Sequence, residues 1–144
     1  MKILFDSSSL IASIIEAHPK HEFALSWLKK VKNKNIDASI SAHSLLEIYS
    51  VLTSAPFKPK IPPELAKELI NTNIRKYFKI VSLSPKEYFT LIDFLSSDDF
   101  KGGIVYDALI FKCAQKLKVN KLITLNAKDF VRLNFHNSIE VVSI

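Results

Sequence analysis

The stretch that decides the fold is Lys2-Ile3-Leu4-Phe5-Asp6-Ser7-Ser8-Ser9. Its apolar run from Ile3 to Phe5 is typical of a short buried strand, and the run ends in one carboxylate and three hydroxyl side chains. Asp6 or one of the serines can cap the helix that follows. We therefore interpret Asp6 as an acid that a buried strand delivers to the surface, and we ask which other acids the fold would bring beside it.

Helix-like and strand-like patterns alternate along the rest of the chain. Apolar residues recur at helical spacing in residues 10–15, 23–31, 45–52, 64–73, 85–95 and 104–117. Further strands are predicted at 36–41, 78–83, 121–125 and 139–144. We expect the helix after Ser84-Pro85 to bury one face, made of Tyr88, Leu91, Ile92 and Leu95. The alternation predicts a three-layer α/β/α sandwich with a mostly parallel central sheet.

Composition limits the classes of protein that this chain can form. With 144 residues, 48% of them hydrophobic, it is long enough for one compact domain, which we expect to span residues 1–144. No apolar run approaches the roughly 18 residues of a membrane span, and the single cysteine, Cys113, excludes an internal disulfide. We expect a soluble, cytoplasmic protein with no membrane partner. Its net charge of +6 favours polyanions such as nucleic acid.

Three further acids follow the pattern set by Asp6. Glu47 interrupts the apolar set of helix 45–52, where a carboxylate needs a partner; the alternative is a half-exposed acid paired with a lysine. Asp107 lies in the first turn of a predicted helix, where the dipole alone would favour an acid. Asp129 follows a predicted strand. Because active sites lie at the carboxyl ends of parallel strands, this constellation suggests a metal site.

Five segments of the chain resemble, in order, the PIN domain, and most of all the small single-domain ribonuclease toxins of the VapC type. These segments are Phe5-Asp6-Ser7-Ser8, His18-Pro19, Ser44-Leu45-Leu46-Glu47-Ile48, Gly102-Gly103-Ile104-Val105-Tyr106-Asp107-Ala108 and Thr124-Leu125-Asn126-Ala127-Lys128-Asp129-Phe130. The resemblance implies an endoribonuclease that depends on Mg²⁺ or Mn²⁺. It also implies RNA as substrate, an antitoxin protein lying across the active-site groove, and a homodimer.

The resemblance also assigns the residues of the site. Asp6, Glu47 and Asp107 correspond to acids of the family's metal site. Members of the family differ in the fourth acid: we assign it to Asp129, with Asn126 as a further oxygen ligand through its side-chain carbonyl. Two hydroxyl residues, Ser8 and Thr124, are expected to contact these acids without binding the metal ion themselves.

Phosphodiester chemistry requires a cluster of this kind. Hydrolysis needs a strong nucleophile and relief of negative charge, and metal ions held by carboxylates supply both. Mg²⁺ and Mn²⁺ prefer oxygen ligands, so acids without cysteine or histidine suit them. Packed carboxylates repel one another, so without a metal at least one should have a raised pKa. We expect lysines, either Lys128 or those within 112–121, to bind flanking phosphates.

Other readings of the same residues are weaker or remain open. A haloacid dehalogenase would need a second acid two residues after Asp6, where Ser8 stands, and the paired acids of a receiver domain are absent. The alternative that stays open is a catalytically inactive PIN-like module that binds RNA or protein. Two features stay unassigned. Asp98 and Asp99 are either turn residues or outer members of the site, and the proline-rich segment 55–63 would serve a partner or a second copy.

Overall fold

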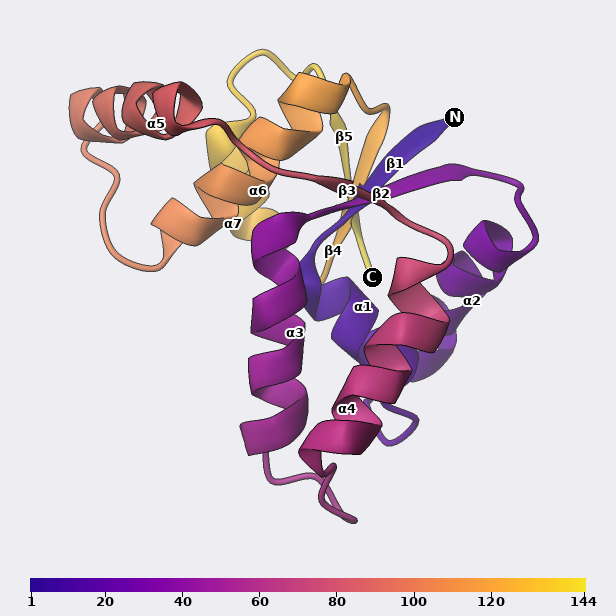
Figure 1. The fold of residues 1–144 in the computed structure, drawn as a ribbon. Coiled ribbons are helices and arrows are strands. Elements are labelled where there is room, and N and C mark those ends of the chain that lie inside the picture. Colours follow the sequence, from indigo (N-terminus) through magenta and orange to yellow (C-terminus); the bar gives the residue numbers. More distant parts are fainter.

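The computed structural model describes residues 1–144 and contains one sheet whose five strands are all parallel (Figure 1). The strands lie in the order β3-β2-β1-β4-β5 and have the bounds β1 (Lys2–Phe5), β2 (Asp37–Ser41), β3 (Lys79–Val81), β4 (Lys121–Thr124) and β5 (Glu140–Ser143). The first strand is therefore the centre of the sheet. In register, Phe5 is opposite Ile40 on one side and Ile123 on the other.

Seven α-helices and one short π-helix connect the strands. Their bounds are α1 (Ser7–Ile14), α2 (His21–Lys32), α3 (Ala42–Ser54), α4 (Pro63–Ile70), η1 (Asn71–Arg75), α5 (Pro85–Ser97), α6 (Ile104–Leu117) and α7 (Ala127–Leu133). The helix predicted at 64–73 thus divides into α4 and η1, and the strand predicted at 78–83 forms ladder pairs over only three residues. Helix α7 was not predicted from the sequence pattern, and the remaining elements lie where it predicted them, within a few residues at their ends.

The two faces of the sheet carry two separate hydrophobic clusters. Alternation along β1 directs Leu4 into the cluster beneath α5, α6 and α7, and directs Ile3 and Phe5 into the cluster beneath α1, α2, α3 and α4. All three side chains are buried. Figure 1 shows the two groups of helices on opposite sides of the strands. The predicted three-layer α/β/α sandwich is confirmed, with a sheet that is parallel throughout.

The buried face of α5 differs from the prediction. Leu91 and Leu95 are buried, but Tyr88 and Ile92 are 44% and 57% exposed. The two residues of each pair are four positions apart, so each pair lies along its own line of the helix. Because α5 follows the edge strand β3 and packs chiefly against α6, it buries only a narrow stripe.

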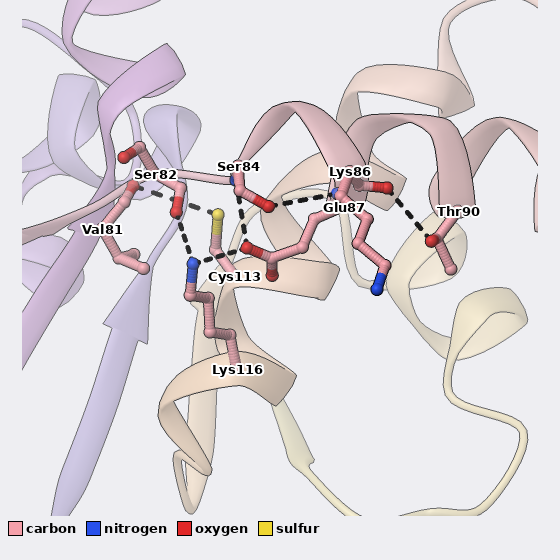
Figure 2. A network of polar contacts seen from close by, with 8 residues as sticks. All are labelled: Val81, Ser82, Ser84, Lys86, Glu87, Thr90, Cys113 and Lys116. Atoms are coloured by element: carbon pink, nitrogen blue, oxygen red, sulfur yellow. Dashed lines mark hydrogen bonds and ion pairs between the residues drawn. The ribbon is translucent and has the colours of Figure 1, made fainter.

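A polar network at the start of α5 holds this helix to α6 (Figure 2). The hydroxyl of Ser84 accepts a hydrogen bond from the backbone N–H of Glu87 (3.2 Å). In return, the Glu87 carboxylate accepts one from the backbone N–H of Ser84 (3.0 Å). From α6, the Lys116 Nζ donates to Glu87 Oε1 (2.7 Å) and to the Ser82 carbonyl (3.0 Å). Nearby, Cys113 is a buried core residue, and burial raises the pKa of its thiol to about 11.

The proline-rich segment 55–62 joins α3 to α4. Figure 1 shows the two helices extending away from the sheet, with this loop at their tip. None of the helices has both the length and the apolar character needed to cross a lipid bilayer.

Candidate active site

The carboxyl ends of β1 and β4 meet at the point where the order of the sheet reverses. From β1 the chain goes first to β2 and β3 on one side, and only later to β4 on the other. The backbone N–H of Asp6 donates to the carbonyl of Ile123 at 3.1 Å, so the acid follows directly on the end of the paired strands. In open parallel sheets, ligands bind at such a reversal.

Asp6 is buried, with 4% of its surface exposed, and hydroxyl and amide donors surround it. It is the cap of α1: Oδ1 accepts from the backbone N–H of Ser9 at 2.9 Å. The Ser8 hydroxyl donates to both carboxylate oxygens (2.8 and 2.9 Å), and the Thr124 hydroxyl donates to Oδ2 at 2.5 Å. Burial raises the pKa of Asp6, and these hydrogen bonds oppose the rise. The acid is therefore held in one orientation.

The two hydroxyls beside Asp6 also bind the backbone after β4. The Ser8 Oγ accepts from the N–H of Leu125 (3.1 Å), and the Thr124 Oγ1 accepts from the N–H of Asn126 (2.8 Å). The first turn of α1 and the β4–α7 connection are thereby joined around one carboxylate.

Glu47 lies on α3 and is half-exposed, with 41% of its side chain accessible. Its partners are not lysines. The hydroxyl of Ser7 donates to Oε1 at 2.5 Å, and the Nε2 atom of His43, one turn earlier on α3, lies 3.7 Å from the same oxygen. Ser7 is the neighbour of Asp6 in the chain, so this bond directs the Glu47 carboxylate towards the end of β1.

Asp107 and Asp129 lie in the first turns of α6 and α7, as the sequence pattern predicted for Asp107. Between them, the Asn126 Nδ2 donates to Oδ2 of Asp129 (2.8 Å) and to Oδ2 of Asp107 (3.3 Å). The amide nitrogen of Asn126, rather than the carbonyl that we considered as a ligand, thus faces the acids. One amide joins two carboxylates.

The carboxylates perturb one another. The pKa of Asp107 is raised to about 7: burial is the largest cause, followed by the negative charges of Asp129, Asp6 and Glu47 and by a hydrogen bond with Asp129. The charges of the other three acids singled out from the sequence therefore all act on the Asp107 carboxyl group. A proton or a cation is needed there to relieve the repulsion.

Two cations that we did not single out line the open cleft beside Asp107. This cleft of about 630 Å³ is bounded by Asp99, Lys101, Gly103, Ile104, Asp107, Asn126, Asp129 and Arg132. Arg132 Nη1 lies 3.8 Å from Asp129, and its guanidinium lies over the ring of Phe100. Arg132 is one of only two arginines and stands three residues after Asp129, a helical spacing that the sequence already offered as a signal.

Two of the lysines that we favoured for phosphate binding form ion pairs away from the site. Lys116 binds Glu87, and Lys121 begins β4, so it pairs with Glu140 at the opposite edge of the sheet. Lys128 is exposed on α7. Asp99, left open between turn residue and outer member of the site, lines the cleft and lies 3.8 Å from Lys101.

An aromatic stack stands beside Glu47 and Asp107. The imidazole of His43 and the ring of Tyr106 are parallel within 3°, with centroids 5.3 Å apart. Neither residue was singled out from the sequence, although His43 precedes Glu47 by four residues and Tyr106 precedes Asp107 by one.

The donor set is of the kind that a hard divalent cation prefers. The four acids offer carboxylate oxygens, and the raised pKa of Asp107 marks a negative cluster that the neighbouring cations do not fully compensate. As placed, no three of the His, Cys, Asp and Glu side chains could bind one ion together. The residues therefore fit Mg²⁺ or Mn²⁺, which keep several water ligands, better than an ion that needs a closed protein cage.

Comparison with known proteins identifies the family. The model of the PIN domain matches residues 3–136. This chain belongs to the PIN domain family. Among curated proteins, this PIN domain is similar to Ribonuclease VapC40 of Mycobacterium tuberculosis, with 33% identity over 106 residues that cover 73% of this chain and 72% of the relative. The resemblance read from its five segments is thereby confirmed.

Solved structures share the fold of this PIN domain. VapBC2 from Rickettsia felis, bound to a DNA fragment from its promoter, matches with a TM-score of 0.68 and 19% identity over 100% of this chain and 99% of that one. VapC20 of Mycobacterium tuberculosis, described as a toxin that cleaves the sarcin-ricin loop, matches with a TM-score of 0.69 and 14% identity over 90% and 94%. At these identities the likeness concerns the fold.

Proposed function

We propose that this PIN domain is an endoribonuclease that depends on Mg²⁺ or Mn²⁺ and acts as the toxin of a toxin-antitoxin pair. One observation carries the proposal: the charges of three acids from different elements combine with burial to raise the pKa of Asp107 to about 7. Such a cluster is costly for a protein that binds no cation. Its position at the reversal of the sheet and the ribonuclease names of its relatives add support.

The four acids have distinct parts in this proposal. Asp6 and Asp107 would bind the ion, with Asp6 held in place by Ser8 and Thr124. Glu47 is oriented by Ser7 and Asp129 by Asn126, and both have room for bridging water because they are partly exposed. When bound, a divalent cation would polarise the phosphate and lower the pKa of a water molecule. Lys101 and Arg132 in the cleft would bind the phosphates on either side.

We assign the protein partner to the apolar groove between α3 and α4, rather than to the cleft beside Asp107, because the groove is apolar and the cleft is lined by charged residues. The groove has a volume of about 450 Å³, and its apolar lining includes Leu45, Leu46, Tyr49, Ile70 and Ile80. Leu46 is 76% and Ile80 42% exposed at this one groove, and apolar side chains gathered in one patch mark a protein interface. We propose an antitoxin segment as the occupant. We also propose a homodimer, for which light scattering would give a mass of twice 16.3 kDa.

The competing function is an inactive PIN-like module that binds RNA or protein. The observation in its favour is that no three acids are placed to bind one ion directly. Cleavage decides between the two. Wild type, Asp6→Asn and the matched control Asp93→Asn, an exposed acid on α5, are incubated with a mixed structured RNA in Mn²⁺ or in EDTA.

The nuclease proposal expects cleavage only in Mn²⁺, only by wild type and Asp93→Asn. RNA binding by all three proteins without cleavage by any would establish the binding module instead.

A further inference from the structure

We propose that Tyr106, stacked on His43, is the platform on which an unpaired RNA base lies beside the phosphate to be cleaved. The inference rests on the proposed function, because RNA is the substrate assigned there to the neighbouring acids. It adds a substrate-positioning residue to that site.

The stack links the two helices that carry Glu47 and Asp107. Tyr106 belongs to α6 and is adjacent to Asp107, whereas His43 belongs to α3 and its Nε2 lies 3.7 Å from Glu47. With the rings parallel within 3° at 5.3 Å, the imidazole covers one face of the tyrosine and fixes its orientation. The platform is therefore held in position relative to both acids.

Tyr106 is exposed although it is a large aromatic residue next to the site. It is 55% exposed, whereas the residues that follow Asp107 on α6, such as Ala108, are buried. A tyrosine that served only to fill the core would lie on that buried face. An oriented ring with more than half of its surface open is the feature that proteins use to stack single-stranded bases.

The position of the cations sets the path of the RNA. Lys101 and Arg132 line the cleft together with Asp107, but neither Tyr106 nor His43 does. The stack thus lies on the Glu47 side of Asp107 and the cations lie on the Asp129 side. A strand whose phosphates lie along the cations would place the base next to the acids over the Tyr106 ring. Every base has an aromatic face, so the platform selects unpaired nucleotides with little base preference.

The test measures stacking apart from cleavage. A 12-nucleotide single-stranded RNA containing 2-aminopurine is titrated in EDTA into Asp107→Asn protein, in which one repelling charge is removed. In that background we compare unaltered Tyr106, Tyr106→Phe, Tyr106→Ala and the control Tyr88→Ala, an exposed tyrosine on α5. Binding affinity and fluorescence quenching are both recorded, and the same RNA is also presented as a duplex.

We expect Tyr106→Ala to bind the single strand roughly 10-fold more weakly and to lose the quenching, because stacking on one aromatic ring accounts for about that much affinity. Tyr106→Phe and Tyr88→Ala should retain both, and the duplex should give no quenching with any protein. With wild-type Asp107 and Mn²⁺, Tyr106→Ala should mainly raise KM.

Unchanged binding and quenching in Tyr106→Ala would overturn the platform, as would an absence of single-strand binding by the protein with Tyr106 intact. A change of the Tyr106→Ala protein from dimer to monomer in light scattering would instead assign the stack to a contact between copies. If quenching depends on Tyr106 but no RNA is cleaved in Mn²⁺, the platform stands and the nuclease proposal fails.

Discussion

The hydroxyl of Thr124 donates a 2.5 Å hydrogen bond to the Oδ2 atom of Asp6, across 118 residues of sequence. Thr124 ends β4, Asp6 directly follows the neighbouring parallel strand β1, and both residues are buried. Through this bond the last residue of one strand orients the acid that follows the other. The candidate site is therefore built into the central strand pair.

Replacing Thr124 with valine keeps the shape of the side chain but removes the donor to Asp6 and the acceptor for the Asn126 N–H. A buried carboxylate that loses one of its hydrogen bonds should reduce the free energy of unfolding by about 1.5 to 3 kcal/mol. Urea unfolding at pH 7 measures the change. The control Thr90→Val removes an exposed hydroxyl that donates to the Lys86 carbonyl of its own helix, and it should cost under about 0.5 kcal/mol. Equal effects of the two changes would contradict the special role of Thr124.

Asp107 should make the metal-free protein less stable as the pH rises. Its folded pKa is about 7, above the ordinary value of 3.8, so the folded protein binds this proton more tightly than the unfolded chain does. The associated stability is complete below about pH 3.8 and is lost as the pH rises through 7. At pH 8 in EDTA, Asp107→Asn should be more stable than wild type.

The expected gain is about 1 to 2 kcal/mol, because a pKa unit corresponds to about 1.4 kcal/mol and solvent screens a group that is partly exposed. Urea unfolding at pH 5 and pH 8 checks the sign, with Asp93→Asn as the control that should show no such difference. An Asp107→Asn protein that is less stable than wild type at pH 8 would show that the repulsion is not the dominant effect.

The ion pair between Glu87 and Lys116 should produce a pH dependence of the opposite sign. Lys116 and the Ser84 backbone N–H lower the pKa of Glu87 to about 2 from 4.5 (Figure 2). Its stabilising contribution is thus present above pH 4.5 and disappears as the pH falls towards 2. The Tm difference between wild type and Glu87→Gln should be largest near pH 6 and should shrink near pH 2.5. Glu64→Gln, in an exposed pair with Lys67, should show little difference at either pH.

Phe130 should be essential for stability although it adjoins the candidate acid Asp129. It is fully buried in the cluster beneath α5, α6 and α7, so Phe130→Ala should cost about 3 to 5 kcal/mol. Phe89 is 70% exposed on α5, and Phe89→Ala is expected to change the free energy of unfolding by less than about 0.5 kcal/mol. A small loss in Phe130→Ala would mean that α7 is not anchored by this residue.

Local patterns predicted most of the architecture because strands and helices differ in the period of their apolar residues. The run from Ile3 to Phe5 and the helical spacing of 104–117 each indicated where an acid would stand, at a strand end and in a first helical turn. Period alone does not tell how wide a buried face is. The exposure of Tyr88 and Ile92 follows from the packing of α5 chiefly against α6, which no local pattern contains.

The contacts between elements could not be predicted either, because they too depend on how the elements pack together. Glu47 was recognised as an acid in an apolar set, but its partners Ser7 and His43 depend on how α3 packs beside α1. The stack on Tyr106 likewise requires two helices to meet. Arg132 and His43 stand at helical spacing from the two acids they approach, so spacing analysis applied to cations would have found them.

The central claim is that the acids around Asp107 bind a divalent cation, and calorimetric titration of Mn²⁺ into metal-free protein tests it most directly. Wild type and the control Asp93→Asn should both bind with the same saturable heat. Asp107→Asn should bind at least about 10-fold more weakly, because it loses a charged oxygen ligand. Equal Mn²⁺ binding by all three proteins, or no binding by wild type, would contradict the claim.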